Sequence, residues 1–271
     1  MKYLSSLADT FTVVCWDQRG AGKNYSFRTS NKEKMTLDSC VEDTHTVIGL
    51  LKKKFFQDKI FIVGHSWGSV LGVLTISRYP EDIAAYVGIG QFVNGSENER
   101  LSYEFTMSEA KRRNDKKAVR TLEKIGAPQN GTYNNANDFL LQRNYLQKYG
   151  GAVFDTEESI TRFVIKAIFT TNEYSPLDYV RYFLGRKHCI KLLYGEMILC
   201  DFLKDILTLS VPVYITQGKH DFNTPSVLAK QWFDALEAPE KAFIWFENSA
   251  HSPHFEESAL WAQTIRRVLI K

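Results

Sequence analysis

The five residues Gly64–Gly68, with the sequence Gly-His-Ser-Trp-Gly, constrain the fold of this chain more than any other segment because of what flanks them. The preceding residues Ile60–Val63 are β-branched or aromatic, which is typical of a strand, and the following residues Ser69–Leu74 carry apolar side chains at helical spacing. A Gly-x-Ser-x-Gly sequence between a strand and a helix predicts a tight turn that lifts the serine hydroxyl above the edge of a sheet. We expect both glycines to be required, because a side chain at either position would collide with the neighbouring strand and helix.

A serine presented in this way acts as a nucleophile when a histidine removes its proton and a carboxylate orients that histidine. The segment Val211–Thr216 predicts a buried strand, and Asp221 follows it in a turn. The segment Lys241–Phe246 predicts another strand, and His251 follows that one. Because parallel sheets gather active sites at the carboxyl ends of their strands, we predict that Asp221 orients His251 and that His251 activates Ser66.

Each of these residues also has a simpler interpretation. Ser66 and Asp221 are residue types that cap helices, but the glycines around the first and the strand-tip position of the second favour catalysis. His254 is an alternative base, although its place after a proline is typical of a helix start, and His220 directly precedes the acid and is expected to point away from it. If His251 is the base, a ring nitrogen should lie about 2.6–3.2 Å from the Ser66 hydroxyl, or somewhat farther without a ligand.

The composition is that of a globular protein with a large core, since 44% of the 271 residues are hydrophobic and 13% are aromatic. The net charge is only +3 and the basic residues are dispersed, so neither nucleic acid nor a membrane is a predicted partner. No run approaches the ~20 apolar residues of a membrane span. The four cysteines show no paired or metal-binding spacing, so we expect free thiols, a cytoplasmic protein, and no metal or organic cofactor.

The order of segments predicts an α/β fold with a mostly parallel sheet and helices on both faces. Short apolar strands alternate with helices over residues 1–94 and again over 203–271, which we assign to one core domain. Residues 95–202 consist of charged amphipathic segments without a convincing strand, and we assign them to a helical cap, or lid, over the site. The other predicted elements of the first stretch are the strands Phe11–Trp16 and Ala84–Gly90 and a helix over Thr36–Phe55 that Thr36 caps.

Three segments together resemble the proline iminopeptidase-like branch of the α/β-hydrolases. They are Asp17–Lys23 (DQRGAGK), Gly64–Ser69 (GHSWGS) and Gln217–Asp221 (QGKHD). The Asp-Gln-Arg-Gly sequence is more discriminating than the serine motif, because most α/β-hydrolases carry other residues there. The resemblance covers the two stretches that we assign to the core domain.

The resemblance implies an α/β-hydrolase fold with an inserted helical cap and a catalytic triad, which falls on Ser66, Asp221 and His251. It also implies that the backbone N–H of Trp67 donates to the oxyanion that forms on the substrate. Asp17, Arg19 and Gly20 would shape the loop beside the active site and contact substrate. A salt-bridged turn that braces the strand ends is an equally good interpretation of these three residues.

One feature of that branch is absent from this sequence. A His-Gly-Gly-Pro-Gly segment supplies the second oxyanion donor in the family, and neither it nor the first strands of the sheet is found here. We therefore expect an N-terminally truncated hydrolase core with impaired activity. In the family, the strand before that segment lies between those corresponding to Phe11–Trp16 and Ile60–Val63, so we expect these two either to pair directly or to leave backbone groups unpaired.

The family also holds the free amine of its substrate with carboxylates of the cap, in a sequence context that has no match here. Candidates by position alone are Glu97, Glu99, Glu104, Glu173 and Glu196, although exposed helix charges are the simpler interpretation. The predicted function is a serine hydrolase of proline iminopeptidase type, which releases N-terminal residues from short peptides. An esterase for small esters or lactones and a non-catalytic hydrolase-like binding domain are the alternatives, and the sequence predicts no oligomeric state.

Overall fold

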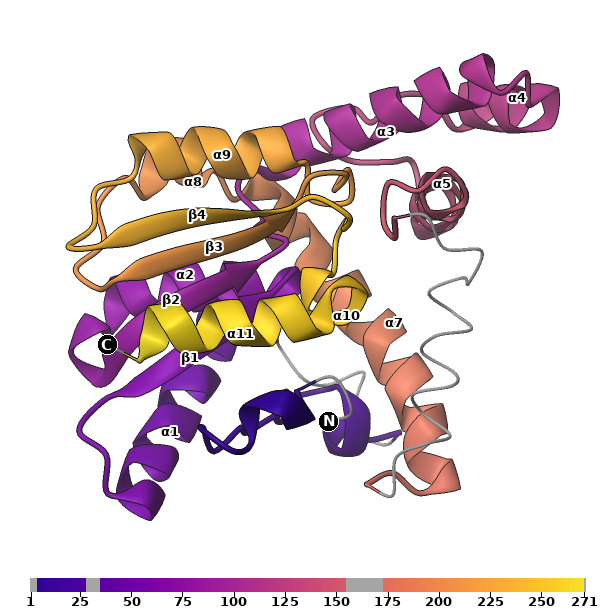
Figure 1. Cartoon of the computed structure of the whole chain (residues 1–271). Helices are drawn as coiled ribbons and strands as arrows, with labels where there is room; N and C mark the ends of the chain where they lie inside the picture. Colours follow the sequence, from indigo (N-terminus) through magenta and orange to yellow (C-terminus); the bar gives the residue numbers. More distant parts are fainter. Residues whose placement is uncertain (1–3, 28–34, 155–172, 271) are drawn as a thin grey trace.

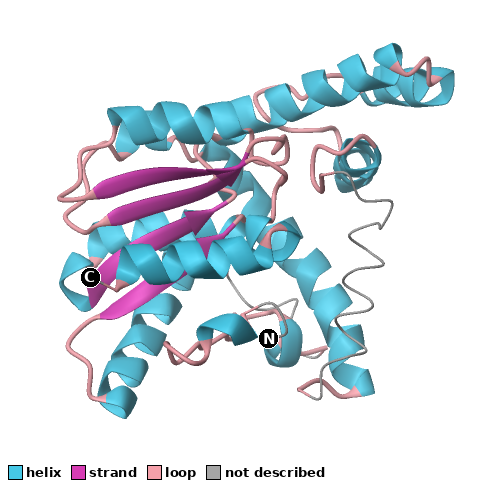
Figure 2. Ribbon diagram, viewed as in Figure 1, coloured by secondary structure: helices cyan, strands magenta, loops and turns pink. Residues whose placement is uncertain are grey.

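Four parallel strands form a sheet at the centre of the described part of the molecule. The computed structural model describes residues 4–27, 35–154 and 173–270. The sheet has the order β1 (Ile60–His65), β2 (Ile83–Ile89), β3 (Val213–Gly218) and β4 (Lys241–Phe246) (Figure 1). All neighbouring pairs are parallel, and the arrowheads point toward the helices that are inserted between β2 and β3 (Figure 2). The predicted α/β class with a parallel sheet is confirmed.

Helices cover both faces of this sheet. The core on one face contains side chains of α1 (Leu37–Phe55), α2 (Trp67–Arg78), α8 (Phe202–Asp205) and α9 (Ser226–Ala235). On the other face, α11 (Ser258–Leu269) and the 3-10 turn η1 (Ser5–Leu7) pack on the strands. The alternation of side chains along β2 produces the two layers, because Tyr86 packs in the first cluster and Ala85 and Val87 pack in the second.

The start of α1 follows from two residues of its sequence. Thr36 Oγ1 accepts a hydrogen bond from the backbone N–H of Ser39 at 3.1 Å, and Ser39 Oγ accepts one from the N–H of Thr36 at 3.0 Å. This reciprocal capping box satisfies two backbone donors and fixes the first turn. The predicted helix over Thr36–Phe55 and its cap are confirmed.

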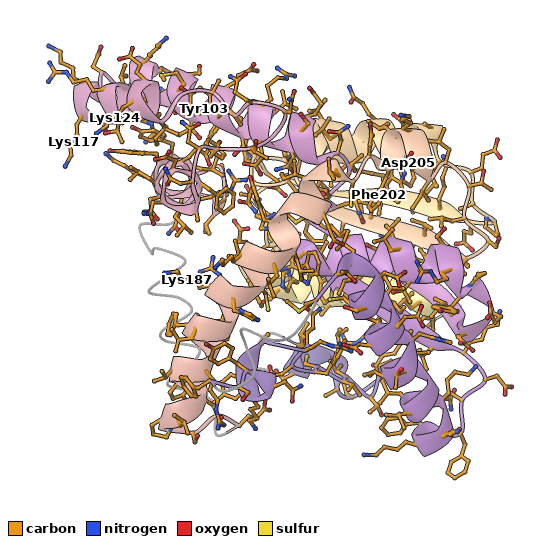
Figure 3. The ribbon with its side chains drawn as sticks, turned by 180° about the vertical axis from the view of Figure 1, so that it is seen from behind. Tyr103, Lys117, Lys124, Lys187, Phe202 and Asp205 are labelled. Atoms are coloured by element: carbon orange, nitrogen blue, oxygen red, sulfur yellow. The ribbon has the colours of Figure 1, made fainter. Side chains whose placement is uncertain are left out.

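The segment between β2 and β3 contributes helices to the described structure and no strand to the sheet. Besides the short α8, the described helices of this segment are α3 (Gly95–Arg112), α4 (Lys116–Ile125), α5 (Ala136–Lys148) and α7 (Pro176–Leu199). The arm formed by α3 and α4 projects away from the sheet, with Lys117 and Lys124 near its outer end (Figure 3). Tyr103 joins the two helices by donating to the Leu122 carbonyl oxygen at 2.9 Å. These helices occupy the stretch that we assign to the cap.

Two sequence expectations concern membranes and thiols. Within the described ranges, no helix is long and apolar enough to cross a bilayer. The four cysteines, Cys15, Cys40, Cys189 and Cys200, form no disulfide within the same ranges.

The predicted strand over Phe11–Trp16 is wrong. No backbone-to-backbone hydrogen bond joins residues 12–17 to the described part of the chain, and a strand exists only as part of such a ladder. β1 pairs with β2 alone among the described residues, so of the two expected arrangements the direct pairing with Phe11–Trp16 is not formed. The two segments meet only through side chains, where the Phe11 ring packs edge-on against Phe61 with centroids 5.9 Å apart. Val63 on β1 is left 47% exposed.

Candidate active site

Ser66 lies in the turn between β1 and α2, as predicted. Its φ of 56° and ψ of −117° are values that non-glycine residues rarely adopt, so the backbone is strained at this residue. The turn is held by a hydrogen bond from the Ser66 N–H to the Ile89 carbonyl oxygen at 3.0 Å. It also needs Gly64, because a Cβ there would lie 2.4 Å from the Gly68 carbonyl oxygen. The same expectation is wrong for Gly68, where an added Cβ would face open space.

The first turn of α2 presents a backbone donor beside Ser66. The N–H of Trp67 has no hydrogen-bond acceptor among the described residues, as is usual at a helix start. The side chain of the same residue is anchored, since its indole Nε1 donates to Gln18 Oε1 at 2.9 Å. A fixed and unpaired N–H at a helix N-terminus is chemically suited to an oxyanion, which is the role that the resemblance implies for Trp67.

Asp221 lies just after β3, is fully buried, and accepts hydrogen bonds from five donors. Its Oδ1 accepts from the backbone N–H groups of Asn223 at 2.8 Å and Thr224 at 2.9 Å. Its Oδ2 accepts from Gln217 Nε2 at 2.8 Å, Thr224 Oγ1 at 2.7 Å and His251 Nδ1 at 3.0 Å. The carboxylate is therefore fixed from several directions and is aimed at the imidazole.

The structure brings His251 to Asp221, and Nε2 of the ring is left without a described partner. The contact between Nδ1 and Asp221 favours a proton on Nδ1, so that Nε2 is the acceptor. Gly90 packs against the ring with a φ of +52°, and a Cβ there would lie 2.8 Å from Nδ1. The expected hydrogen bond between Ser66 and His251 is not formed in this structure, which is common for catalytic hydrogen bonds in the absence of substrate.

Two further histidines pack beside His251. The His65 ring lies 4.8 Å from the His251 ring and 4.5 Å from the His254 ring, and its Nε2 lies 3.1 Å from the His251 carbonyl oxygen. Burial lowers the pKa of His254 to about 3 and holds the pKa of His65 well below its usual range. The rings pack by their faces and edges, and the described residues contain no group of three side chains placed to hold a metal ion.

The two alternative histidines contact other residues. His254 lies in the short helix α10 (Pro253–Glu256), as its place after a proline predicts, and its Nδ1 is buried without a partner. His220 stacks on Phe154 with ring centroids 3.9 Å apart, and its Nε2 lies 3.1 Å from the Glu247 carbonyl oxygen. Of the three histidines near this loop, His251 is the one that contacts Asp221.

The turn that contains Asp17, Arg19 and Gly20 is a brace between elements. Arg19 forms a two-pronged ion pair with Asp43 of α1, with N–O distances of 2.8 and 2.5 Å. The carboxylate of Asp17 accepts from the Lys23 N–H at 3.0 Å and from the Tyr174 hydroxyl, and the Gly20 carbonyl oxygen contacts the Cys189 thiol of α7 at 3.4 Å. These contacts favour the bracing interpretation over direct substrate contact.

The candidate glutamates of the cap are engaged within the protein. Glu97 and Glu104 both pair with Arg100 on the exposed side of α3, each at 2.7 Å, and Glu196 accepts from the Leu37 N–H at 2.7 Å. Glu173 is exposed.

Glu99 differs from these because it is buried. One oxygen, Oε1, pairs with Arg143 at 2.5 Å, whereas Oε2 has no hydrogen-bond partner.

The residues that support Asp221 were not identified from the sequence. Gln217 and Thr224 both donate to Asp221, and the Gln217 carbonyl oxygen Oε1 accepts from the Gln91 N–H at 2.9 Å. The one available signal was Gln217, a long polar residue directly after the predicted strand Val211–Thr216. A buried amide has to find partners, so its position marks a place where the core is built around a polar group.

A family model described as alpha/beta hydrolase fold matches residues 1–258, and the chain belongs to this family. The chain is 34% identical over 268 residues to "Probable aminopeptidase YbaC" of Bacillus subtilis (strain 168), a match that covers 98% of this chain and 82% of that protein. It is 26% identical over 239 residues to "Proline iminopeptidase" of Thermoplasma volcanium, covering 83% of this chain and 70% of that protein.

Solved structures show the same fold. A proline iminopeptidase from Mycobacterium smegmatis superposes with a TM-score of 0.66 at 15% identity, covering 98% of this chain and 84% of that one. VinJ superposes with a TM-score of 0.65 at 17% identity over the same shares. The sequence relatives place the chain in the proline iminopeptidase-like branch of the family. The family and the named relatives show that the protein is a hydrolase, and they do not support the alternative of a non-catalytic domain.

Proposed function

We propose that this hydrolase is an aminopeptidase that releases the N-terminal residue of short peptides by nucleophilic attack of Ser66. The observation that carries the proposal is the pairing of His251 Nδ1 with the buried Asp221 carboxylate at 3.0 Å, on the same sheet edge as the strained turn of Ser66. A nucleophile, a base and an orienting acid at the tips of parallel strands are the parts that acyl transfer needs.

The chemistry follows from the atoms of these residues. Ser66 Oγ attacks the carbonyl carbon of the scissile bond while His251 Nε2 takes the hydroxyl proton, and the N–H of Trp67 donates to the oxyanion. His251 then gives the proton to the leaving amine, and an acyl-enzyme on Ser66 remains. A water molecule, deprotonated by the same Nε2, hydrolyses that ester and restores the serine.

The relatives named aminopeptidase and proline iminopeptidase support a peptide substrate with a free N-terminal amine. Among the candidate carboxylates, the contacts favour Glu99 for that amine. It lies in the second turn of α3, and its Oε2 is buried without a partner. It is also close to the acid, because the side chain of the adjacent Asn98 donates to the carbonyl oxygen of Asn223 at 3.0 Å.

The test compares substrates on the whole chain. We expect proline and alanine anilides to be hydrolysed with a higher kcat/KM than a short-chain nitrophenyl ester. Ser66→Ala should remove both activities. Glu99→Gln should raise KM for the anilides and leave KM for the ester unchanged, because the ester carries no amine. Equal effects of Glu99→Gln on both substrates would remove Glu99 from the proposal.

An esterase for small esters or lactones is the second candidate. It is favoured by the pairing of Glu97 and Glu104 with Arg100 and of Glu99 with Arg143, since a carboxylate that already pairs with an arginine binds an ammonium group less well. Hydrolysis of the ester without measurable cleavage of either anilide would establish this alternative in place of the aminopeptidase.

A further inference from the structure

The carboxylate of Glu256 collects backbone donors from two distant parts of the chain. It is the last residue of α10, and its Oε1 accepts from the Ser252 N–H at 2.8 Å. Its Oε2 accepts from the Ala250 N–H at 3.1 Å and from the Phe154 N–H at 2.7 Å. Ala250 and Ser252 are the two neighbours of His251, whereas Phe154 belongs to the segment inserted between β2 and β3. One side chain thus joins both sides of the base to the cap.

The same cap segment contacts the loops of the acid and the base through its own carbonyl groups. The Gly151 carbonyl oxygen accepts from the Phe222 N–H at 2.9 Å, next to Asp221. The Ala152 carbonyl oxygen accepts from the His251 N–H at 3.3 Å. Residues 151–154 therefore cross the two loops that follow β3 and β4. Glu256 supplies the only side chain among these hydrogen bonds, and substitution can remove it without changing the backbone.

The carboxyl group of Glu256 is largely buried, so its three hydrogen bonds stabilise the charged form. Burial raises the pKa of this carboxyl group, and the N–H donors of Phe154, Ala250 and Ser252 act in the opposite direction. Backbone N–H groups that lose such an acceptor are left unsatisfied unless the loop moves to find another. A small movement of this loop displaces the imidazole, because Ala250 and Ser252 flank it in sequence.

We propose that Glu256 is a positioning residue, whose carboxylate fastens the cap segment Gly151–Phe154 to the loop Ala250–Ser252 and thereby sets the place of the His251 ring. The proposal rests on the role of His251 as the base. In this proposal, the carboxylate of Glu256 links the position of the cap segment to the position of the loop that carries His251.

The neighbouring Glu257 provides a matched control. Its Oε2 accepts from the Asn248 N–H at 3.1 Å and from Ser249 Oγ at 2.7 Å, so it holds the same loop a few residues earlier. It forms no hydrogen bond with a cap residue within the described part of the chain. Substitution of either glutamate by glutamine removes one charge and keeps the size of the side chain. Any difference between the two variants reports the contacts that only Glu256 makes.

The experiment compares Glu256→Gln with Glu257→Gln on the anilide substrate, with kcat, KM and the melting temperature measured for each. In the glutamine, an NH₂ group replaces one acceptor oxygen and faces a backbone donor. We expect kcat of Glu256→Gln to fall between about tenfold and about 10²-fold, the loss that a misplacement of about 1 Å causes, with KM nearly unchanged. The downfield proton resonance of the hydrogen bond between His251 and Asp221 should shift in this variant and stay in place in Glu257→Gln.

A second pair of variants keeps the proposal testable if Glu256→Gln does not fold. Phe154→Ala and Phe154→Pro both remove the ring that stacks on His220, but only the proline also removes the N–H that donates to Glu256. We expect a lower kcat for the proline variant than for the alanine variant. Equal kcat values for these two, together with an unshifted proton resonance, would overturn the coupling of the cap to the base.

The outcomes separate this proposal from the proposed function. If Glu256→Gln retains the wild-type kcat and resonance while His251→Ala is inactive, the positioning role is overturned and the catalytic role of His251 stands. If both glutamine variants lose the same activity, Glu256 acts only through general stability of the loop, and the proposal is again overturned. If His251→Ala remains active, the proposed function itself fails.

Discussion

The two lateral sides of the sheet, formed by β1 and by β3 and β4, position their parts of the candidate site in different ways. At the β3–β4 end, every residue of β3 is buried, and Asp221 is fixed by five donors. At the β1 end, the strand alternates between partly buried and exposed residues, with Phe61 39% and Val63 47% exposed, and it pairs with β2 alone among the described residues. The hydroxyl of Ser66, at the tip of this strand, has no hydrogen-bond partner in the described structure.

This difference separates two means of placing a catalytic group. Asp221 and His251, the proposed acid and base, are placed by hydrogen bonds that support one another, so the loss of one contact leaves the others in place. Ser66, the proposed nucleophile, is placed by the backbone, through its strained φ and the close approach at Gly64. Substitutions should therefore be tolerated unequally at the two ends of the sheet.

The largest expected effect is the loss of the nucleophile or the base. Ser66→Ala and His251→Ala should each lower kcat by about 10⁶-fold, because residues of a triad act as a unit. The double variant should be no worse than either single variant. Steady-state kinetics on an anilide, with circular dichroism to check the fold, provides the measurement. Losses that multiply in the double variant would show that the two residues act separately.

His254 provides the control for the base. His254→Gln should retain most of the wild-type kcat, because the His254 ring packs on His65 and Trp261, whereas the partner of Asp221 is His251. An inactive His254→Gln beside an active His251→Ala would reverse the assignment.

The next effect concerns stability at the two ends of the sheet. Ile215 on β3 is fully buried, so Ile215→Ala should lower the free energy of unfolding by about 2–5 kcal/mol. Val63→Ala on the half-exposed β1 should cost less than about 1 kcal/mol, because little packing is lost at an exposed position. Urea unfolding of both variants measures the difference. Equal losses would mean that β1 is as well packed as β3.

A third effect is the sensitivity of the fold to acid. Both His65 and His254 have lowered pKa values in the folded protein, whereas in the unfolded chain a histidine titrates near pH 6.5. Below that pH the unfolded chain binds protons that the folded chain does not, so the stability is complete above about pH 6.5 and is lost as the pH falls toward the folded values. Each histidine contributes a slope of about 1.4 kcal/mol per pH unit.

The measurement is the free energy of unfolding at pH 7.5, 6.0 and 5.0. His254→Gln should reduce the loss between pH 7.5 and 5.0, and His220→Gln, which lies outside the three-histidine cluster, is its control. If His254→Gln loses as much stability on acidification as the wild type, the buried histidine is not the source of the effect.

The smallest effect tests how well the acid is supported. Thr224→Val removes one of the five donors to Asp221 and keeps the size of the side chain. We expect kcat to fall by less than about tenfold, since one hydrogen bond contributes about 1 kcal/mol and four donors remain. Asp221→Asn, by comparison, should lower kcat by about 10⁴-fold. A loss near that value for Thr224→Val would show that the four remaining hydrogen bonds do not hold Asp221 in place.

The parts of this fold that the sequence predicted are those that depend on local pattern. The elbow at Ser66 was recognised from a Gly-x-Ser-x-Gly sequence between a strand and a helix, and the cap of α1 depends only on Thr36 and Ser39. Asp221 and His251 were predicted because each follows a strand sequence, and strand tips in a parallel sheet meet at one edge. Each of these inferences uses residues that are close in the sequence.

The parts that were not predicted depend on residues far apart in the chain. Phe11–Trp16 has the composition of a strand, but a strand forms only where another supplies its hydrogen bonds, and the described chain supplies none there. Glu256 is an ordinary helix residue in the sequence, and its importance appears only when Phe154 and Ala250 are brought to its carboxylate. Gly68 was expected to be sterically required, but the space around it is open.

The most direct test of the central claim is to label the enzyme with a fluorophosphonate probe and to map the modified residue by mass spectrometry. The account predicts one modified peptide that contains Ser66, no labelling of Ser66→Ala, and very slow labelling of His251→Ala at the same pH, because an unactivated serine reacts poorly. Modification of a different residue, or labelling of His251→Ala at the wild-type rate, would contradict the claim that Ser66 is a nucleophile activated by His251.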